Sequence, residues 1–248
     1  MLRLLMTLMI AAMLSACTTS PGPVSVGAAN ASSELPPRPQ ADVARDEGRK
    51  PFQVMDFLGV EAGMTAMDVM ASSGYYTEAL ANAVTAQGRV YAQNPAVALR
   101  FYGGRNDRAM NARLFGNRLP NVRRLDREFT DLGIVPGTVD VAIMALNFHD
   151  IYNRSPEQAQ MILAVLKDVL KPGGVLGIID HNSNEGADHA ALHRMPAAQS
   201  IAAAEAAGFA VEVSDLLANP NDDRTQGPFT EGLRGSTDRF LLKLSKPE

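Results

Sequence analysis

The sequence predicts an α/β protein with a Rossmann-like, doubly wound, seven-stranded and mostly parallel sheet that has one antiparallel edge strand. Short apolar runs alternate with amphipathic helical runs from residue 65 onward, which is the pattern of successive βαβ units. The run 138–146, TVDVAIMAL, is almost continuously apolar, as in a central parallel strand that is covered on both faces. The last two apolar runs, 209–213 and 239–244, are joined by a loop, and we expect them to pair antiparallel at one edge.

The first βαβ unit lies within VEAGMTAMDVMASSGYYTEALANAVTAQGRVYAQNP, and the rest of the fold follows it in chain order. Its pattern predicts a strand at 65–70, a turn of small residues at 71–74, a helix at 75–84 and a second strand at 89–93. Such a unit is typical of mononucleotide binding, with the ligand over the carboxyl ends of the strands.

The other elements are predicted from local signals of the same kind. Pro51 interrupts the helical pattern before the first strand. Ser155 and Pro156 begin a later helix, because serine can cap a helix and proline suits its first turn. The expected elements outside the first unit are a broken helix at 41–58, a helix at 107–115, strands at 121–125 and 138–146, a helix at 155–170, a strand at 175–179, a helix at 196–207, and the final strands at 209–213 and 239–244.

Composition divides the chain into three segments. Residues 1–16 hold one basic residue and a short apolar run, which predicts a secretory signal peptide that is too short to span a bilayer. A buried N-terminal helix is the alternative, although no amphipathic period is visible. Residues 17–40 are rich in Ser, Pro, Gly and Ala and nearly uncharged, which predicts a flexible tether. Residues 41–248 are long enough for one α/β domain.

Cys17 is the only cysteine of the chain, so it cannot form an internal disulfide. Together with Leu14-Ser15-Ala16 it resembles a bacterial lipobox, which implies cleavage before Cys17 and a membrane anchor of two or more acyl chains on this residue. Thr18, rather than an aspartate, comes next. By the same resemblance this implies the periplasmic face of the outer membrane rather than the inner membrane. A cytoplasmic protein with a coincidental apolar start is the alternative.

The charge of the chain argues against nucleic acid as its partner. The formal net charge is −4, and it becomes about −5 once the segment that contains Arg3 is removed. A mildly acidic chain lacks the long-range attraction to phosphates that nucleic-acid binding needs. The arginines between 105 and 124 are interrupted by acids and apolar residues, so we interpret them as a solvated surface.

Three motifs in order resemble class I S-adenosylmethionine-dependent methyltransferases. They are AMDVMASSGYYTEALA at 66–81, Asp131-Leu132 with six further residues before VDVAI at 139–143, and LKPGGVLGIID at 170–180. More narrowly, LNFHD at 146–150 and TDRF at 237–240 resemble a group of exported methyltransferases. The resemblance implies S-adenosylmethionine as the cofactor, and a small molecule or an envelope component as the methyl acceptor.

The resemblance also implies a role for individual residues. Asp68 would organise the loop near the methionine amine, Asn94 takes the place of the acid that binds the ribose, and Asn147 would lie beside the methyl donor. An amide can donate and accept hydrogen bonds there, but it lacks the charge of a carboxylate. The implied cofactor-binding residues are Asp68, Ala71, Ser72, Gly74, Tyr75, Asn94, Glu128, Phe129 and Asn147.

The cofactor loop departs from the pattern of the family. Two of its three usual glycines are replaced, by Met70 and Ser72, and only Gly74 remains. Glycine serves where the backbone must approach a ligand or take a positive φ. Two interpretations follow. Either Met70 turns its side chain into the core and the loop still binds the cofactor, or the fold has lost cofactor binding.

Two of the four histidines directly follow expected strand ends, His149 after 138–146 and His181 after 175–179. Neighbouring strand tips converge on one cleft, and a histidine beside a carboxylate suits general-base catalysis near neutral pH. The candidate catalytic residues are therefore His149, Asp150 and His181, with a hydrogen-bonded structural histidine as the alternative. Arg194 and Arg239 are candidates for contact with an anionic substrate.

The other two histidines, His189 and His193, have the i, i+4 spacing of residues on one helix face. With a nearby acid they could form a metal site, but this spacing alone is a weak signal and Pro196 follows closely, so we assign no metal ligand.

Three hypotheses remain open from the sequence. The first is an exported, lipid-anchored methyltransferase. The second is a non-catalytic envelope lipoprotein that keeps the fold to bind a ligand or a protein. The third is a metal-assisted hydrolase that uses the histidines.

Overall fold

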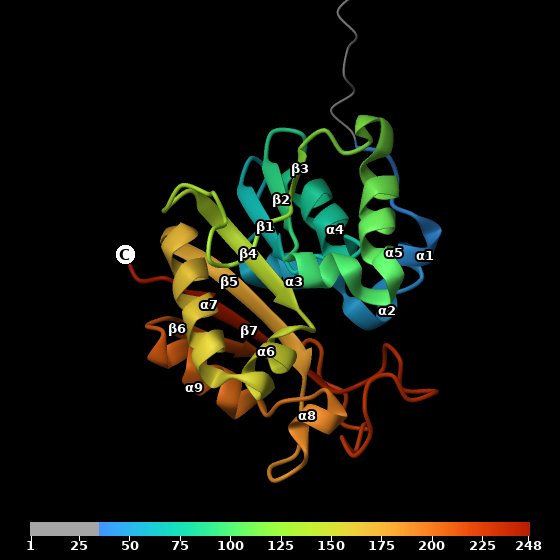
Figure 1. Ribbon diagram of the computed structural model, residues 1–248, viewed down its shortest axis with the longest axis vertical. Helices are drawn as coiled ribbons and strands as arrows, with labels where there is room; N and C mark the ends of the chain where they lie inside the picture. Colours follow the sequence, from blue (N-terminus) through green and yellow to red (C-terminus); the bar gives the residue numbers. More distant parts are fainter. Residues whose placement is uncertain (1–34) are drawn as a thin grey trace, which may run out of the picture. The chain divides into compact units, whose positions relative to one another are not determined.

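Seven strands form one mixed sheet in the computed structural model, which describes residues 35–248 (Figure 1). The expected signal peptide at 1–16, Cys17 and most of the expected tether lie outside the described residues. The strand order across the sheet is β3-β2-β1-β4-β5-β7-β6. The strands are β1 (Thr65–Val69), β2 (Arg89–Gln93), β3 (Val122–Leu125), β4 (Val139–Ala145), β5 (Leu170–His181), β6 (Ala210–Ser214) and β7 (Arg239–Ser245).

The pairing directions confirm the predicted fold class. The strands β1 to β5 pair in parallel, whereas β7 runs antiparallel to both β5 and β6. The final two strands therefore pair antiparallel, as predicted, and the antiparallel strand itself lies second from the edge. Burial explains this order, because β7 is largely buried whereas β6 is mostly exposed and suits the edge.

The helices begin and end where local chemistry requires. Lys50 takes a left-handed φ of 44° between α2 and α3, because Pro51 cannot continue α2 but can start α3. Ser155 Oγ accepts a hydrogen bond from the N–H of Gln158 at 3.1 Å, which confirms the predicted cap of α7. The helices are α1 (Gln40–Val43), α2 (Asp46–Arg49), α3 (Pro51–Leu58), α4 (Tyr75–Val84), α5 (Ala96–Leu114) with the short 3₁₀ turn η1 (Phe115–Asn117), α6 (Phe148–Arg154), α7 (Pro156–Val169), α8 (His189–Leu192) and α9 (Ala197–Ala206).

Two apolar layers cover the two faces of the sheet. In β4, Val141 and Ile143 belong to the layer that includes α3 and α4, whereas Ala142 and Met144 belong to the layer that includes α7 and α9. Figure 1 shows α4 and α5 on one side of the sheet and α7 and α9 on the other. This burial on both faces explains why the sequence of β4 is apolar almost throughout.

The sheet brings the carboxyl ends of β1, β2, β4 and β5 together. β1 lies between β2 and β4, so the order of strands along the chain reverses beside β1. Ligands of doubly wound sheets bind outside the strand ends at this point. None of the helices in the described part of the chain has the length and apolar character needed to cross a bilayer.

Candidate functional site

The loop between β1 and α4 has a left-handed backbone at all three positions where the family resemblance expects glycine. The φ angles are 52° at Met70, 53° at Ser72 and 87° at Gly74. Residues other than glycine are strained in this region, at a cost of roughly 1 kcal/mol each. The chain therefore keeps the conformation of a glycine-rich loop although two of the glycines are replaced.

Side-chain amides at the end of β2 hold this loop in place. Gln93 Oε1 accepts a hydrogen bond from the N–H of Met70 at 3.0 Å, and Asn94 Oδ1 accepts one from the N–H of Ser72 at 2.8 Å. The carbonyl of Gln93 also accepts from the N–H of Ala71 at 2.9 Å. Both amide side chains are fully buried, where hydrogen bonds are stronger than in water. These bonds offset the backbone strain at Met70 and Ser72.

The Met70 side chain agrees with the first of the two interpretations of this loop. It packs against the apolar layer that contains Met67, Val69 and residues of α7. The side chain is thus accommodated by the core of the protein. The replacement of a glycine by methionine at this position is compatible with an unobstructed loop.

Gly74 is required by the packing around it as well as by its φ angle. A Cβ at this position would lie 2.9 Å from Cδ and Nε of Arg113. Arg113, on α5, crosses the loop: its Nε donates to the carbonyl of Ser73 at 2.8 Å, and its guanidinium pairs with Glu78 and Asp42. Glu78 is fully buried and needs such cationic partners. Part of the arginine-rich region that the sequence predicts to be solvated is therefore a buried ion-pair network.

Asp68 lies in β1, close to the loop, and is buried. Its Oδ2 accepts a hydrogen bond from Thr77 Oγ1 at 2.6 Å. Burial raises the pKa of Asp68 to about 7, although the bond from Thr77 and the charge of Arg113 oppose the rise. Near neutral pH this carboxyl group is therefore divided between its neutral and charged forms.

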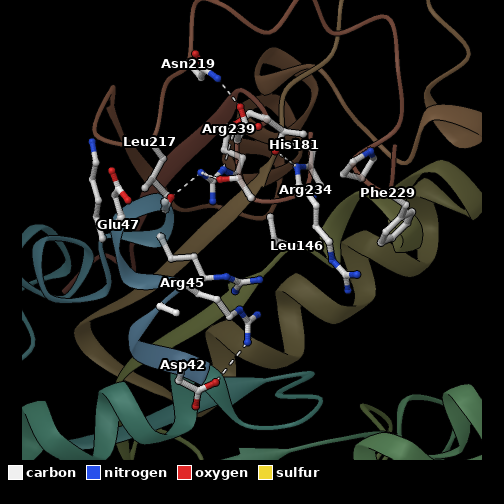
Figure 2. Close-up of a pocket in the computed structure, with 18 of the residues that line it drawn as sticks. Asp42, Arg45, Glu47, Leu146, His181, Leu217, Asn219, Phe229, Arg234 and Arg239 are labelled. Atoms are coloured by element: carbon white, nitrogen blue, oxygen red, sulfur yellow. Dashed lines mark hydrogen bonds and ion pairs between the residues drawn. The ribbon is translucent and has the colours of Figure 1, made fainter. Parts of the chain in front are cut away.

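A cavity of about 1020 Å³ opens beside the carboxyl ends of β4 and β5. Ser73 of the loop, Leu146 after β4 and His181 at the end of β5 border it. Residues of α1, α2 and α5 and of the segment 217–239 form its other walls. Figure 2 labels Asp42, Glu47 and Arg234 among them. A cavity of this size can hold a small-molecule cofactor or substrate.

The lining of this cavity is strongly cationic. Its acidic residues are Asp42 and Glu47, and Asp42 is already paired with Arg113 at 2.7 Å. Its basic residues are Arg45, Arg49, Lys50, Arg105, Arg234 and Arg239.

Four of these arginines, Arg49, Arg105, Arg234 and Arg239, have no ion pair with a carboxylate within residues 35–248. Arg239 is buried, and its guanidinium donates to the carbonyl of Gly48 at 2.6 Å. Unpaired positive charge around a cavity attracts anions, so the site is suited to an anionic ligand.

One buried carboxylate, Asp180, holds both of the histidines at the strand ends. Its Oδ1 lies 2.6 Å from His149 Nδ1 and accepts a hydrogen bond from the N–H of His181 at 2.8 Å. Its Oδ2 accepts from the N–H of His149 at 2.8 Å. The two imidazole centroids are 6.0 Å apart, so these histidines lie together, as expected from neighbouring strand ends.

The two histidines differ in charge although they share this carboxylate. Burial alone would lower the pKa of His149, but Asp180 and Asp150 outweigh it and raise the pKa to about 10. Burial lowers the pKa of His181 to about 3, against the attraction of Asp180 and with the help of the positive charge on His149. At neutral pH His149 is therefore an imidazolium and His181 is neutral. Of the two, His181 lines the cavity.

The residues that the resemblance assigns to the adenosine part of the cofactor are packed into the structure. Asn94 is fully buried against the loop, and Phe129 belongs to the apolar core. Glu128 Oε1 accepts a hydrogen bond from the N–H of Ala96 at 2.9 Å. None of these three residues lines the cavity.

The other implied cofactor residues lie beside the cavity rather than in its lining. Asn147 donates to the carbonyl of Ala145 at 2.7 Å, and Tyr75 Oη donates to Asp46 Oδ1 at 2.6 Å. Asp68, Ala71, Ser72 and Gly74 belong to β1 or to the loop, from which only Ser73 reaches the lining.

Three of the cavity arginines were missed by sequence reasoning. Arg45, Arg105 and Arg234 come from elements without a clear periodic pattern, and only their convergence in the fold brings them together. Arg239 lines the cavity, as expected for a residue that contacts an anionic ligand. Arg194 does not, because it is fully buried and pairs with Asp222 at 2.8 Å.

The expectation that His189 and His193 share a helix face is wrong. The helix α8 is a single turn that ends at Leu192, and His193 follows it with a left-handed φ of 50°. His189 Nδ1 lies 3.0 Å from Ser183 Oγ, whereas His193 Nδ1 lies 2.9 Å from Asp150 Oδ1. The two rings therefore have different partners.

Comparison with known proteins identifies the fold. A methyltransferase from Aquifex aeolicus that is named as S-adenosylmethionine-dependent superposes with a TM-score of 0.61 at 23% identity, over 82% of this chain and 93% of that chain. A protein from Bordetella parapertussis that is named as a possible exported protein superposes with a TM-score of 0.55 at 14% identity, over 83% of this chain and 68% of that chain. No protein-family model and no curated protein matches the sequence.

One neighbour shows that this fold is not confined to methyl transfer. The [4+2]-cyclase SpnF superposes with a TM-score of 0.60 at 16% identity, over 81% of this chain and 80% of that chain. At these identities the likeness concerns the fold, which is that of the class I methyltransferases. The chemistry has to be argued from the site.

The left-handed backbone at Ser72 predicts an unusual order of stabilities among its variants. Ser72→Gly should change the free energy of unfolding by less than about 1 kcal/mol, because relief of strain is offset by the entropy of glycine in the unfolded chain. Ser72→Val should lose about 2 kcal/mol or more, since a β-branched side chain is worst at positive φ. Urea unfolding measures both. Ser73→Val, at the next residue, is the control; equal losses at both positions would contradict the account.

The raised pKa of Asp68 predicts a pH-dependent effect of Asp68→Asn. Between about pH 4 and pH 7 the unfolded chain loses this proton while the folded protein keeps it, so the contribution of Asp68 to stability falls as the pH rises. The variant should therefore gain stability relative to wild type across this window, by up to about 1.4 kcal/mol for each unit of the pKa shift. Urea unfolding at a series of pH values measures the difference. A difference that is constant from pH 4 to pH 8 would contradict it.

Proposed function

We propose that the protein is an S-adenosylmethionine-dependent methyltransferase that acts on an anionic small molecule or an anionic component of the cell envelope. The observation that carries the proposal is the loop at 70–74, which keeps the left-handed backbone of a glycine-rich loop beside a large cavity. The names of several solved structures with this fold support the choice of cofactor.

The residues near Ser73 fit the methionine part of the cofactor. A carboxylate here would meet Arg49, which has no carboxylate partner within the described chain, and the guanidinium of Arg49 lies 4.7 Å from the centre of the Tyr75 ring. Asp68 lies buried beneath the same loop, and in our proposal its carboxylate attracts the amine without joining the lining of the cavity. The backbone of Ala71 and Gly74 completes this half of the proposed site.

The adenosine part of the cofactor requires a local exchange of hydrogen bonds. The Asn94 amide holds the N–H of Ser72, and its nitrogen lies 3.5 Å from the carbonyl of the same residue. An amide can both donate to and accept from ribose hydroxyls. In our proposal the nitrogen of the Asn94 amide turns from the Ser72 carbonyl to the ribose on binding, while its oxygen keeps the N–H of Ser72. Glu128 and Phe129 lie on the adenine side and Asn147 near the methyl group.

For methyl transfer the protein has to position the methyl acceptor and to accept its proton. Bound S-adenosylmethionine supplies a methyl group on a sulfonium that is already activated for transfer. His181 is proposed to accept the proton of the methyl acceptor, because it is neutral and lines the cavity, and because an anion bound beside it would raise its low pKa toward the range of a general base. Thr237 Oγ1 lies 2.8 Å from its Nδ1, which leaves Nε2 for this role. His149 and Asp150 would form a charged pair next to His181 and help to position it.

The charge of the cavity indicates the class of methyl acceptor. Six basic residues and two acidic residues line it, and four of its arginines have no carboxylate partner within residues 35–248. Arginine binds carboxylate and phosphate groups in a forked geometry that lysine cannot provide. We therefore propose an acceptor with a carboxylate or phosphate group, and no role for nucleic acid.

Export and lipid anchoring remain part of the proposal. The segment that carries them, 1–17, lies outside the described residues, so its support is the sequence and the likeness to the Bordetella protein. Anchoring at Cys17 would hold the domain at the periplasmic face of the outer membrane. Its acceptor would then be a molecule of the envelope.

A non-catalytic binding protein is the second candidate, and one observation favours it. Asn94 and Phe129 are buried, so the adenosine half of the site is closed. If this half does not open, the cationic cavity remains available to an anionic ligand without a nucleoside cofactor. Cofactor binding decides between the two candidates.

Calorimetry with S-adenosylmethionine and S-adenosylhomocysteine tests the proposed function. Wild type should bind either molecule at one site per chain, and Arg49→Gln should weaken binding at least about tenfold by removing a charge-assisted hydrogen bond. Arg123→Gln, at an exposed position on β3 outside the cavity, should bind as wild type does. No heat and no thermal shift at millimolar concentrations would leave the binding protein as the function.

Labelling with a radioactive fatty acid tests the anchor. The wild-type chain should carry label and sediment with the membranes, and Cys17→Ser should lose both, because the chain has no other cysteine. Label or membrane association that persists in the variant would show that Cys17 is not the anchor.

A further inference from the structure

Three potential metal ligands converge beside the cavity, from parts of the chain that are far apart in sequence. His149 and Asp150 lie in the first turn of α6, and His193 follows α8. One potential ligand atom from each of the three residues lies within 4.8 Å of the other two. The carboxylate oxygen is 3.3 Å from His149 Nε2 and 2.9 Å from His193 Nδ1.

His149 directs an unsatisfied nitrogen into this cluster. Its side chain is 4% exposed, and Nε2 makes no well-formed hydrogen bond among residues 35–248, although the Asp150 carboxylate lies 3.3 Å away. The other ring nitrogen lies 2.6 Å from Asp180 Oδ1, and the backbone N–H of the same residue donates to Asp180 Oδ2. Buried polar atoms without a partner are rare and call for an explanation. A carboxylate that orients an imidazole by its far nitrogen is the usual second-layer arrangement at metal sites.

Hydrogen bonds and an ion pair also fix the position of the segment that contains His193. Asn153 Nδ2, on α6, donates to the carbonyl of Arg194 at 3.0 Å, which ties α6 to the residue after His193. Arg194 is itself fully buried and pairs with Asp222 at 2.8 Å. The three ligands are therefore placed before any ion binds.

We propose that His149, Asp150 and His193 form a binding site for a divalent transition metal of the zinc type. Because a metal ligand must be deprotonated, the ion would displace the proton that His149 holds in the metal-free protein. Two imidazole nitrogens and one carboxylate oxygen suit such an ion, whereas magnesium and calcium prefer oxygen ligands throughout. Three protein ligands leave a coordination position for water or for an anion.

The site adjoins the cavity. The His149 ring lies 6.0 Å from that of His181, and the His193 ring lies 5.4 Å from that of Phe229; both of these neighbours line the cavity. A metal here adds positive charge next to the arginines and provides a second means of holding an anionic ligand. The proposal does not depend on cofactor binding, and it holds for either of the two functions considered above.

Calorimetry with zinc chloride on the full chain, previously dialysed against a chelator, tests this site. Wild type should bind one zinc ion per chain with a dissociation constant of about 10 μM or lower. His193→Gln and Asp150→Asn should each weaken binding at least about tenfold, because each removes one of three ligands. Both positions are partly or fully exposed, so the folded structure should survive, as circular dichroism would verify.

The control is His189→Gln, which alters a neighbouring histidine whose Nδ1 contacts Ser183 outside the cluster. It should bind zinc as tightly as wild type does. Cobalt, as a spectroscopic substitute, should give visible absorption bands in wild type that His193→Gln loses. Saturable zinc binding that survives both cluster variants, binding that His189→Gln reduces equally, or no binding at about 100 μM zinc would overturn the proposal.

Discussion

The hydrogen bonds between the β2 end and the loop that follows β1 are the constraint on which the site depends. Gln93 and Asn94 satisfy the N–H groups of Met70 and Ser72 in a buried setting and so hold both residues at positive φ. Because β1 and β2 are parallel neighbours, their ends meet and the amides can reach across. The loop in turn places Ser73 at the edge of the cavity and lets Arg113 cross over Gly74.

The sequence was a good guide to elements whose signal is local. The buried strand β4, the break at Pro51 and the cap at Ser155 follow from residue types that act within a few positions of themselves. The loop conformation could not be predicted in this way, because Met70 and Ser72 are poor choices for positive φ until distant amides are brought to them. The cavity could not be predicted from the sequence either, because part of its wall is the irregular segment 217–239.

The protonation states of the two histidines also could not be predicted from the sequence. Sequence reasoning placed His149 and His181 at neighbouring strand ends, and they do lie together. It could not distinguish them, because their difference arises from the geometry of Asp180 and from depth of burial. One buried carboxylate keeps a proton on His149, and that charge helps to keep His181 neutral. His149, which the sequence favours as a base because it precedes Asp150, is therefore the histidine that is charged at neutral pH.

The crystal structure of the protein with S-adenosylhomocysteine tests the central claim most directly. We predict that the homocysteine part lies beside Ser73 and Leu146, with its carboxylate on cavity arginines and with Met70 and Ser72 still at positive φ. The nitrogen of the Asn94 amide should then bond the ribose, while its oxygen still accepts from the N–H of Ser72. A complex in which the nucleoside lies elsewhere, or in which the loop at 70–74 has refolded to admit it, would contradict the account.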